Sequence, residues 1–194
     1  TKGFVLQEGK YVIESVLGQG SFGITYLATT KFQGPLGDIS VKVAIKEFFA
    51  RDLNMRHPDG TVAEVSSGSL SGKYANDFQR EAKNLSSLKH PNIINVLEAF
   101  SENNTHYYVM EYLDGGNLDD YIQSNGRLSE SEALDIASQM ASALSYMHSH
   151  KMLHLDLKPK NVMRRSDGTV CLIDFGLSKQ YESSGEPESS TTIG

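Results

Sequence analysis

The sequence has little cysteine, no run of positive charge and no long hydrophobic stretch. Its one cysteine, Cys171, cannot form a disulfide within the chain, which favours a reducing compartment and predicts a cytoplasmic protein. The 18 Lys and Arg are outnumbered by 24 Asp and Glu, which gives a formal net charge of −6. Because affinity for nucleic-acid backbones depends on cationic side chains, we expect no nucleic-acid partner. A membrane-spanning helix needs roughly 18 apolar residues in succession, so we expect no membrane segment.

The rest of the composition is typical of a folded globular protein, with 39% hydrophobic and 22% charged residues in 194. This length fits one domain or two small lobes. Strand patterns with one helix fill residues 1–113, helical patterns dominate residues 114–194, and the segment Asp114-Gly115-Gly116 separates them. We therefore predict an α+β fold with two lobes, divided after residue 113.

Alternation of apolar and polar residues predicts the strands. They cover residues 11–17, 24–29, 41–45, 93–100, 105–112 and 170–173. Glycine, proline and aspartate within residues 31–40 predict a turn between the second and third strands. Residues 51–72 are polar and rich in glycine and serine, which predicts a surface loop.

A spacing of three to four residues between apolar positions predicts three helices. The first buries the residues Phe78, Ala82, Leu85 and Leu88 and stops before Pro91. The second is short and contains Leu118, Tyr121 and Ile122. The third begins at a capping box formed by Ser129 and Glu132. Its predicted buried stripe consists of Ala133, Ala137, Met140, Ala141, Leu144 and Met147.

The segment Gly18-Gln19-Gly20-Ser21-Phe22-Gly23 has the spacing G-x-G-x-x-G, which dinucleotide-binding folds also carry. In those folds the motif lies between a strand and a helix, whereas here the following residues predict a strand. A glycine turn between two strands can lay backbone amides over phosphate groups, because no Cβ obstructs the approach. An ordinary glycine hairpin has the same pattern, so this motif alone leaves both interpretations open.

Lys46 ends the third predicted strand and follows residues that we expect to be buried. A buried ammonium needs an acid or a phosphate as its partner. Glu81 lies at the edge of the apolar face of the first helix and is the candidate acid. A solvated surface lysine would fit the same position, so the pair gains weight only from further motifs.

Two carboxylate motifs follow in the second half of the chain. Asp156 precedes Asn161 by five positions, and Asp174 comes just past a predicted strand in the segment Asp174-Phe175-Gly176. Mg²⁺ prefers hard oxygen ligands, and phosphoryl transfer needs such an ion close to the phosphates. These side chains are therefore candidates for a magnesium site and a catalytic carboxylate.

Taken in order, the five motifs between residues 18 and 176 resemble those of the eukaryotic-like (Hanks-type) protein kinases. Lys158, two residues after Asp156, is similar to the serine/threonine subclass, and residues 23–28 resemble bacterial members. The resemblance implies a two-lobed kinase fold with a complete N-lobe, an antiparallel sheet plus one helix, and an incomplete helical C-lobe. It also implies a protein substrate and the cofactors ATP and Mg²⁺, with ATP between the lobes near Lys46, Glu111 and Asp174.

The resemblance assigns a role to each matching residue. The glycine-rich segment, with Gly18, Gly20, Ser21, Phe22 and Gly23, would cover the ATP phosphates. The residues implied around adenine are Thr25, Ala44, Met110, Glu111 and Leu113, with Met110 as the gatekeeper and with Glu111 and Leu113 offering backbone groups. Lys46, held by Glu81, would bind the α- and β-phosphates.

The implied catalytic residues lie in the second half. Asp156 would orient the substrate hydroxyl and accept its proton, and Lys158 would neutralise the γ-phosphate. Asn161 and Asp174 would hold Mg²⁺. Two residues depart from the family pattern: Thr25 stands in place of valine, and Leu155 in place of the arginine before the catalytic aspartate. That arginine binds an activation-loop phosphate in many relatives, so we expect activity here not to depend on such a phosphate.

The family pattern continues past residue 194, and Glu186-Pro187-Glu188 lies too close to Asp174 to be its Ala-Pro-Glu motif. We therefore expect a chain truncated within the activation segment that binds Mg-ATP but transfers little phosphate, from a parent protein that phosphorylates serine and threonine hydroxyls. The alternative is a nucleotide-binding or protein-interaction module without catalysis. An uncovered apolar stripe on the third helix would favour self-association through the C-lobe surface.

Overall fold

The computed structural model describes residues 2–35, 37–65, 69–176 and 178–180. The chain divides into two compact units. The first unit comprises Thr1–Ser86 and Val96–Tyr112, and the second comprises Ser87–Asn95 and Leu113–Gly194. The serine- and threonine-rich residues 183–192, which could carry phosphorylation sites, lie outside the described residues.

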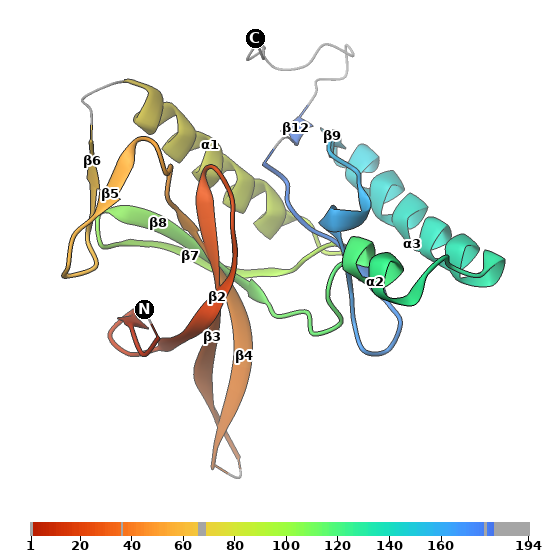
Figure 1. Cartoon of the computed structure of the whole chain (residues 1–194), viewed down its shortest axis with the longest axis horizontal. Helices are drawn as coiled ribbons and strands as arrows, with labels where there is room; N and C mark the ends of the chain where they lie inside the picture. The colour runs from red at the N-terminus through yellow and green to blue at the C-terminus, as the bar shows by residue number, and fades with distance from the viewer. Residues whose placement is uncertain (1, 36, 66–68, 177, 181–194) are drawn as a thin grey trace. The chain divides into compact units, whose positions relative to one another are not determined.

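The first unit is built on an antiparallel sheet of six strands in the order β1-β2-β3-β4-β8-β7 (Figure 1). These strands are β1 (Val5–Leu6), β2 (Tyr11–Gln19), β3 (Gly23–Gly34), β4 (Gly37–Phe48), β7 (Val96–Glu102) and β8 (Thr105–Glu111). A separate hairpin consists of β5 (Asn54–Arg56) and β6 (Val62–Glu64) and precedes helix α1 (Ser69–Ser87). Strands β1 to β4 lie side by side in the order of the chain. β8 then pairs with β4, and β7 forms the outer strand beyond β8, so that β4 lies in the interior of the sheet.

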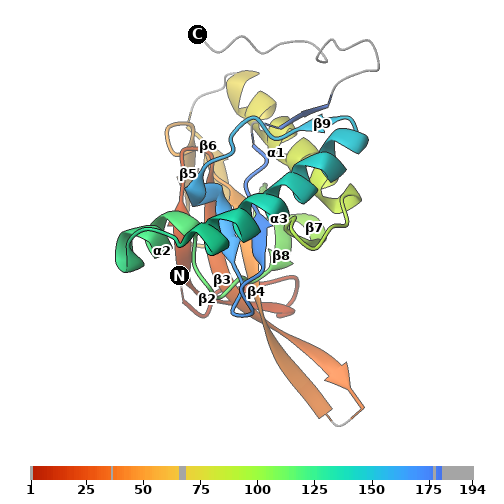
Figure 2. The same ribbon diagram turned by 90° about the vertical axis from the view of Figure 1, so that its right-hand side faces the viewer.

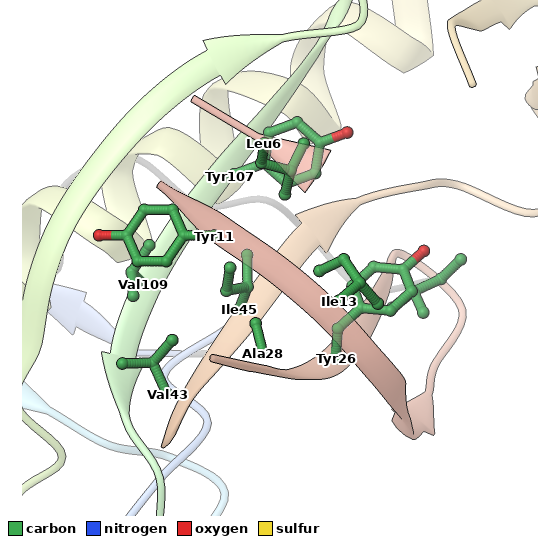
Figure 3. Packing of buried hydrophobic residues seen from close by; sticks show 10 residues of the cluster. Leu6, Tyr11, Ile13, Tyr26, Ala28, Val43, Ile45, Tyr107 and Val109 are labelled. Carbon is green, nitrogen blue, oxygen red and sulfur yellow. The ribbon is translucent and has the colours of Figure 1, made fainter. Parts of the chain in front are cut away.

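The hydrophobic core of the first unit lies on one face of this sheet. Successive side chains of a strand point to opposite faces, so the core takes every second residue of each strand. Its members are Leu6, Tyr11, Ile13, Ile24, Tyr26, Ala28, Val43, Ile45, Tyr107 and Val109. Figure 3 shows these side chains converging from β1, β2, β3, β4 and β8. We call this side the core face.

Helix α1 packs against the opposite face. The Phe78 ring lies 5.7 Å from that of Phe48 on β4 and 5.1 Å from that of Tyr108 on β8. The four apolar positions predicted from helical spacing are all buried, which confirms the predicted helix. Burial of this stripe, more than intrinsic propensity, is what stabilises a surface helix.

Two predictions about the connections in this unit were wrong. Residues 51–72 are not a plain loop, because they form β5, β6 and the first turn of α1. The turn expected over residues 31–40 is shorter than predicted, because β3 continues to Gly34 and β4 begins at Gly37, so that each strand is 12 residues long. Gly37 has a φ of +116°, a conformation that glycine adopts without a steric penalty.

The β5–β6 hairpin is joined to the sheet through a buried carboxylate. Glu47 on β4 accepts hydrogen bonds from the Tyr26 and Tyr107 hydroxyls, both at 2.7 Å, and its side chain is 1% exposed. Arg56 on β5 completes the group with an ion pair to the same carboxylate. We call these four residues the Glu47 cluster. They line one side of a pocket of about 340 Å³, whose remaining wall is formed by Phe4, Leu6, Ile13, His57, Pro58 and Gly60.

The described part of the second unit contains helices α2 (Leu118–Asn125) and α3 (Glu130–Ser149), two short strand pairs and a 3₁₀ turn. Strands β10 (Val162–Arg164) and β11 (Val170–Leu172) pair with each other, as do β9 (Met152–Leu153) and β12 (Lys179–Gln180), and a 3₁₀ turn spans Pro159–Asn161. The predicted capping box is confirmed, because Ser129 and Glu132 each bond the other's backbone N–H. Figure 2 shows α3 beside these short strands.

The predicted buried stripe of α3 is only partly correct. Met140 and Met147 are buried and Leu144 is half-buried, but Ala133, Ala137 and Ala141 are exposed. The helix packs on β9 and β11, which cover one side of the stripe. The exposure expected on the other side is therefore present. Among the described residues, α3 and the other helices are too short or too polar to cross a membrane.

Candidate active site

The glycine-rich segment forms the turn between β2 and β3. The Gly20 amide donates to the Gly23 carbonyl oxygen at 2.9 Å, and the tip is tied to the end of β4 by two further backbone hydrogen bonds. Those bonds run from the Phe49 amide to the Phe22 oxygen at 3.1 Å and from the Arg51 amide to the Ser21 oxygen at 3.2 Å. The strand that was predicted to follow the motif is present, which favours the phosphate-covering interpretation over a dinucleotide-binding turn.

The glycines differ in the space around them. A Cβ at Gly23 would lie 2.9 Å from the Glu47 carbonyl oxygen and 3.6 Å from the Lys46 Cε atom. A Cβ at Gly18 would have nothing within 4 Å, and one at Gly20 would only reach the Gly23 oxygen at 4.0 Å. Gly23 is therefore required by packing within the protein, whereas the protein itself leaves the space above Gly18 and Gly20 open.

Phe22 extends the glycine turn toward α1. Its side chain is half exposed, and its ring lies 4.4 Å from that of Tyr74 on the helix. Such an aromatic contact contributes about 0.5–1.5 kcal/mol. The position of the turn is thus coupled to α1, the helix that carries Glu81.

Lys46 and Glu81 form the ion pair that the sequence predicted. The Lys46 Nζ atom lies 3.0 and 3.3 Å from the two Glu81 carboxylate oxygens. The Tyr108 hydroxyl donates to Glu81 Oε1 at 3.0 Å, and burial raises the pKa of this phenol far above its ordinary value. The lysine side chain keeps 20% exposure while that of Glu81 has 6%. The ammonium is therefore fixed by a buried acid but still reachable from outside.

Strand register places the other predicted nucleotide residues on the same face as Lys46. Thr25 and Tyr108 lie directly opposite Lys46, and the next pair along, Ala44 and Met110, lie opposite each other. Because residues two apart on a strand share a face, these side chains form one surface on the side away from the core. Glu111 ends β8, and Leu113, in the second unit, is buried.

Asp156 lies at the centre of a hydrogen-bonded loop in the second unit. The Lys158 ammonium lies 2.7 Å from Asp156 Oδ2. The Asn161 Nδ2 atom donates both to Oδ2 and to the backbone oxygen of Asp156, each at 2.9 Å. The hydrogen bond from Lys158, and a further one from Asn161, hold the pKa of Asp156 below its ordinary value. The carboxylate is therefore ionised at neutral pH and fixed in direction.

The backbone of this loop is held by His154. Its Nδ1 atom accepts from the Asp156 amide at 3.3 Å, so Nε2 carries the proton that faces the Ile173 oxygen at 3.2 Å. The ring also meets Phe175 edge-on at a centroid distance of 4.9 Å. His154 thus joins the Asp156 loop to the Asp174-Phe175-Gly176 segment.

Two non-glycine residues in this region adopt left-handed backbone conformations. Leu155 has a φ of +64° and Asp174 a φ of +61°. Such conformations cost of order 1–3 kcal/mol for most residues, and aspartate tolerates them better than leucine does. The contacts of His154 and the Ile173-to-Asn161 backbone hydrogen bond, 2.9 Å long, offset this cost.

Comparison with known proteins identifies this arrangement. Residues 11–193 match the protein kinase domain family. The chain belongs to that family. It is 31% identical to the serine/threonine-protein kinase PrkC of Bacillus subtilis over 187 residues, which are 96% of this chain and 25% of PrkC. It is 32% identical over 185 residues to a probable serine/threonine-protein kinase, PknB of Lactococcus lactis, with 95% of this chain and 26% of PknB covered.

A solved structure confirms the predicted kinase fold. The apo form of PpkA-294 matches with a TM-score of 0.79 and 26% identity, over 91% of this chain and 61% of the PpkA-294 chain. The kinase domain described here thus has the N-lobe sheet with one helix and part of the C-lobe. The chain spans about a quarter of the length of the two curated relatives above.

The donor atoms in the second unit of the kinase domain fit a magnesium ion. Asn161 uses its Nδ2 atom on Asp156, so its amide oxygen takes no part in these bonds and is a hard oxygen atom of the kind that Mg²⁺ prefers. Asp174 supplies a carboxylate just past β11. Mg²⁺ is usually bound through one or two carboxylates together with substrate phosphates. Within the described residues, His, Cys, Asp and Glu side chains do not gather in groups of three or more.

Tyr108 and Tyr74 are site residues that the sequence did not reveal. Tyr108 donates a hydrogen bond to Glu81 in the Lys46–Glu81 pair. Predicting this contact would have required the pairing register of β8 against β4, which places Tyr108 opposite Lys46. Tyr74 lies one turn before Phe78 on α1, and its contact with Phe22 leaves no signal in the local pattern.

Proposed function

We propose that the protein to which this kinase domain belongs transfers the γ-phosphoryl group of ATP to serine or threonine hydroxyls of a protein substrate. The observation that carries the proposal is that each unit holds its own charged group in a fixed direction. In the first unit the Lys46 ammonium is held by a buried acid, and in the second the ionised Asp156 carboxylate is bonded to Lys158 and Asn161. Phosphoryl transfer needs mostly positioning and electrostatic stabilisation, which such groups supply. The named serine/threonine kinases among the relatives support the substrate class.

In the proposed nucleotide site, Lys46 binds the α- and β-phosphates while Glu81 and Tyr108 fix its direction. Backbone amides of Gly18, Gly20 and Gly23 approach the phosphates, with Ser21 and Phe22 at the tip of the turn. The adenine lies against Thr25, Ala44 and Met110 and meets the backbone of Glu111 and Leu113.

In the proposed transfer step, Asp156 accepts a hydrogen bond from the substrate hydroxyl and takes its proton. The bond from the hydroxyl oxygen to the γ-phosphorus forms as the bond from that phosphorus to the oxygen of the leaving ADP breaks. A carboxylate whose pKa is below its ordinary value is a weak base, so its main contribution is orientation. Lys158, whose pKa is raised by its hydrogen bond to Asp156, remains a cation beside the γ-phosphate. Asn161 and Asp174 would hold Mg²⁺, which neutralises phosphate charge when bound.

For residues 1–194 taken alone, we propose Mg-ATP binding with little transfer. The second candidate, a nucleotide-binding or interaction module without catalysis, is less well supported because the phosphate-binding and carboxylate residues are all present. A cytoplasmic location and a serine or threonine in 183–192 as a regulatory site remain predictions.

The test of the proposed nucleotide site is thermal unfolding with ATP, with and without Mg²⁺. A ligand at 100 times its Kd stabilises the folded state by about 2.7 kcal/mol, so Mg-ATP should raise the Tm of the wild type. Lys46→Met should lose this rise, measured against its own nucleotide-free Tm. Lys10→Ala, which removes an ion-paired lysine near β2 on the edge of the sheet, should keep it. An equal rise in all three proteins would contradict the proposed role of Lys46.

The glycine-rich segment gives a second prediction. Gly20→Ala should leave the Tm unchanged and weaken Mg-ATP binding, because its methyl group has room in the protein but enters the space proposed for phosphate. Gly23→Ala should lower stability by about 1–3 kcal/mol, because its Cβ would collide with the Glu47 backbone. Urea unfolding and ATP titration of both variants separate the two effects. If Gly20→Ala bound ATP normally, the proposed phosphate position would be wrong.

A further inference from the structure

The hairpin of β3 and β4 extends beyond the strands on either side of it. β2 pairs with β3 only as far as Thr30, and β8 pairs with β4 only from Val43 onward. Among the described residues, 31–34 therefore pair only with 37–40, and Val41 and Lys42 pair on one side only, with Thr30 and Thr29. We call residues 31–34 and 37–42 the arm, and Figure 2 shows it projecting past the rest of the sheet.

One face of the arm is apolar and exposed. Opposed residues share a face, so Phe32 and Ile39 lie together, with Val41 two positions along β4. These side chains are 51%, 57% and 38% exposed. The same face continues into the core face through the opposed pair Ala28 and Val43. A two-stranded ribbon is marginally stable alone, and an exposed apolar surface on it indicates a partner.

The free edge of the arm on β4 is complementary to itself. Reading Asp38-Ile39-Ser40-Val41-Lys42 against the same segment in the opposite direction places Asp38 opposite Lys42, Ile39 opposite Val41 and Ser40 opposite Ser40. All five side chains are exposed, and β4 has no strand pairing on this side until Val43 meets β8, within the described residues. Opposite charges and apolar pairs directly across a ladder stabilise antiparallel pairing.

We propose that the arm pairs with the arm of a second copy of this chain. The two β4 strands run antiparallel about a twofold axis that passes through Ser40. Alternate residues of this edge turn their backbone N–H and C=O groups outward, so the new ladder satisfies groups that face water in the single chain. Such an interface is isologous, because each copy contributes the same surface.

The pairing also joins the apolar faces of the two arms. Ile39 of one copy lies beside Val41 of the other, on the face that already carries Phe32. The result is a four-stranded ribbon with one continuous apolar side. The other edge of the arm, on β3, is not complementary to itself in charge. Its residues are Lys31, Phe32, Gln33 and Gly34, so that the lysine has no acidic residue to pair with in a second copy.

Charge reversal tests the register. Asp38→Lys would place Lys opposite Lys twice, and Lys42→Asp would place Asp opposite Asp twice, so each single variant should dimerise at least tenfold more weakly than the wild type. The double variant Asp38→Lys/Lys42→Asp restores both pairs and should dimerise like the wild type. An equimolar mixture of the two single variants should form heterodimers. The measurement is sedimentation velocity over a range of protein concentrations, with circular dichroism confirming that each variant is folded.

A cysteine placed on the axis gives a second, independent test. Ser40→Cys, in a Cys171→Ser background, should form a covalent dimer on mild oxidation with diamide, because directly opposed residues lie within disulfide distance. Lys31→Cys is the matched control: it is also exposed and lies opposite Ser40 in the same hairpin, but the two Lys31 positions of the dimer would be three strand spacings apart, about 14 Å, so it should form no covalent dimer.

The outcomes separate this surface from others. A wild type that stays monomeric at every concentration overturns the proposal. So does a dimer that resists both single charge reversals, a result that would place the interface elsewhere, for instance on the exposed alanines of α3. A double variant that remains monomeric while folded would overturn the register through Ser40. Each of these results is independent of ATP, so the proposed function would not be affected.

Discussion

In the full-length protein, Asp156→Asn is expected to lower kcat for phosphorylation of a serine- or threonine-containing protein by about 10²–10⁴-fold while Mg-ATP binding is retained. Asparagine keeps the shape and can still accept the Asn161 hydrogen bond, but it has no charge to hold the Lys158 ammonium and orient the substrate hydroxyl, and it cannot take a proton. The loss should therefore fall on kcat rather than on the KM for ATP. Transfer of radiolabelled phosphate, with ATP titrated in parallel, measures both quantities.

Asp167→Asn is the matched control for this variant. Asp167 also lies in the second unit and also has a lowered pKa, because it accepts hydrogen bonds from Thr169, but it has no proposed contact with substrate. Its replacement should leave kcat unchanged. A wild-type rate in Asp156→Asn would remove the assigned role of Asp156, and the interaction-module alternative would gain support if the wild type bound Mg-ATP without any transfer.

The site was predictable from sequence because its chemistry demands particular residue types in a fixed order. An ammonium, a pairing acid, a carboxylate and two oxygen ligands have few substitutes, and Lys46, Glu81, Asp156 and Asn161 stand at the expected spacings. Helical periodicity made Glu81 the candidate partner of Lys46, since a residue beside the buried Ala82 lies at the edge of the apolar face, and the order of the other motifs gave that candidate its weight. Both inferences use local sequence, which the chain displays directly.

The arm and the Glu47 cluster were not predictable in the same way, because both depend on strand register. Glycine and proline near residue 35 were recognised as a turn, but the sequence did not show that pairing continues to Gly34 and Gly37. Glu47 directly follows Lys46 and looks like a second surface charge. Only the twofold alternation of β4, combined with the position of the β5–β6 hairpin, places it on the opposite face and inside the protein.

Because side chains alternate along β4, the neighbouring residues Lys46 and Glu47 point to opposite faces of the sheet and have different roles. Lys46 faces the proposed nucleotide, and Glu47 faces the core, where it ties β3, β8 and β5 to the same strand. A strand anchored from its far side is held firmly when its near side binds a charged ligand. We therefore expect the Glu47 cluster to support the fold of the first unit without contacting ATP.

Glu47→Ala is expected to lower the free energy of unfolding by about 2–4 kcal/mol, because it leaves two buried phenol hydroxyls and a half-buried guanidinium without their acceptor. The corresponding fall in Tm is on the order of 10 °C for a chain of this size. Glu98→Ala is the matched control, since Glu98 also pairs with a cation, Lys10, but its side chain is 28% exposed against 1% for Glu47. Exposed pairs contribute about 0–1 kcal/mol, so this variant should unfold nearly like the wild type.

The mechanism of the loss can be separated from simple cavity formation. Adding Tyr26→Phe and Tyr107→Phe to Glu47→Ala removes two of the stranded donors and should recover part of the stability, because a polar group costs most when its partner alone is deleted. Burial, and then the charge of Glu47, raise the pKa of both tyrosines above the ordinary 10.0, so they stay protonated in the folded state. Their contribution to wild-type stability should therefore be complete below pH 10 and decrease as the pH rises above it. If the triple variant were no more stable than Glu47→Ala, the cost would come from lost packing instead of unsatisfied donors.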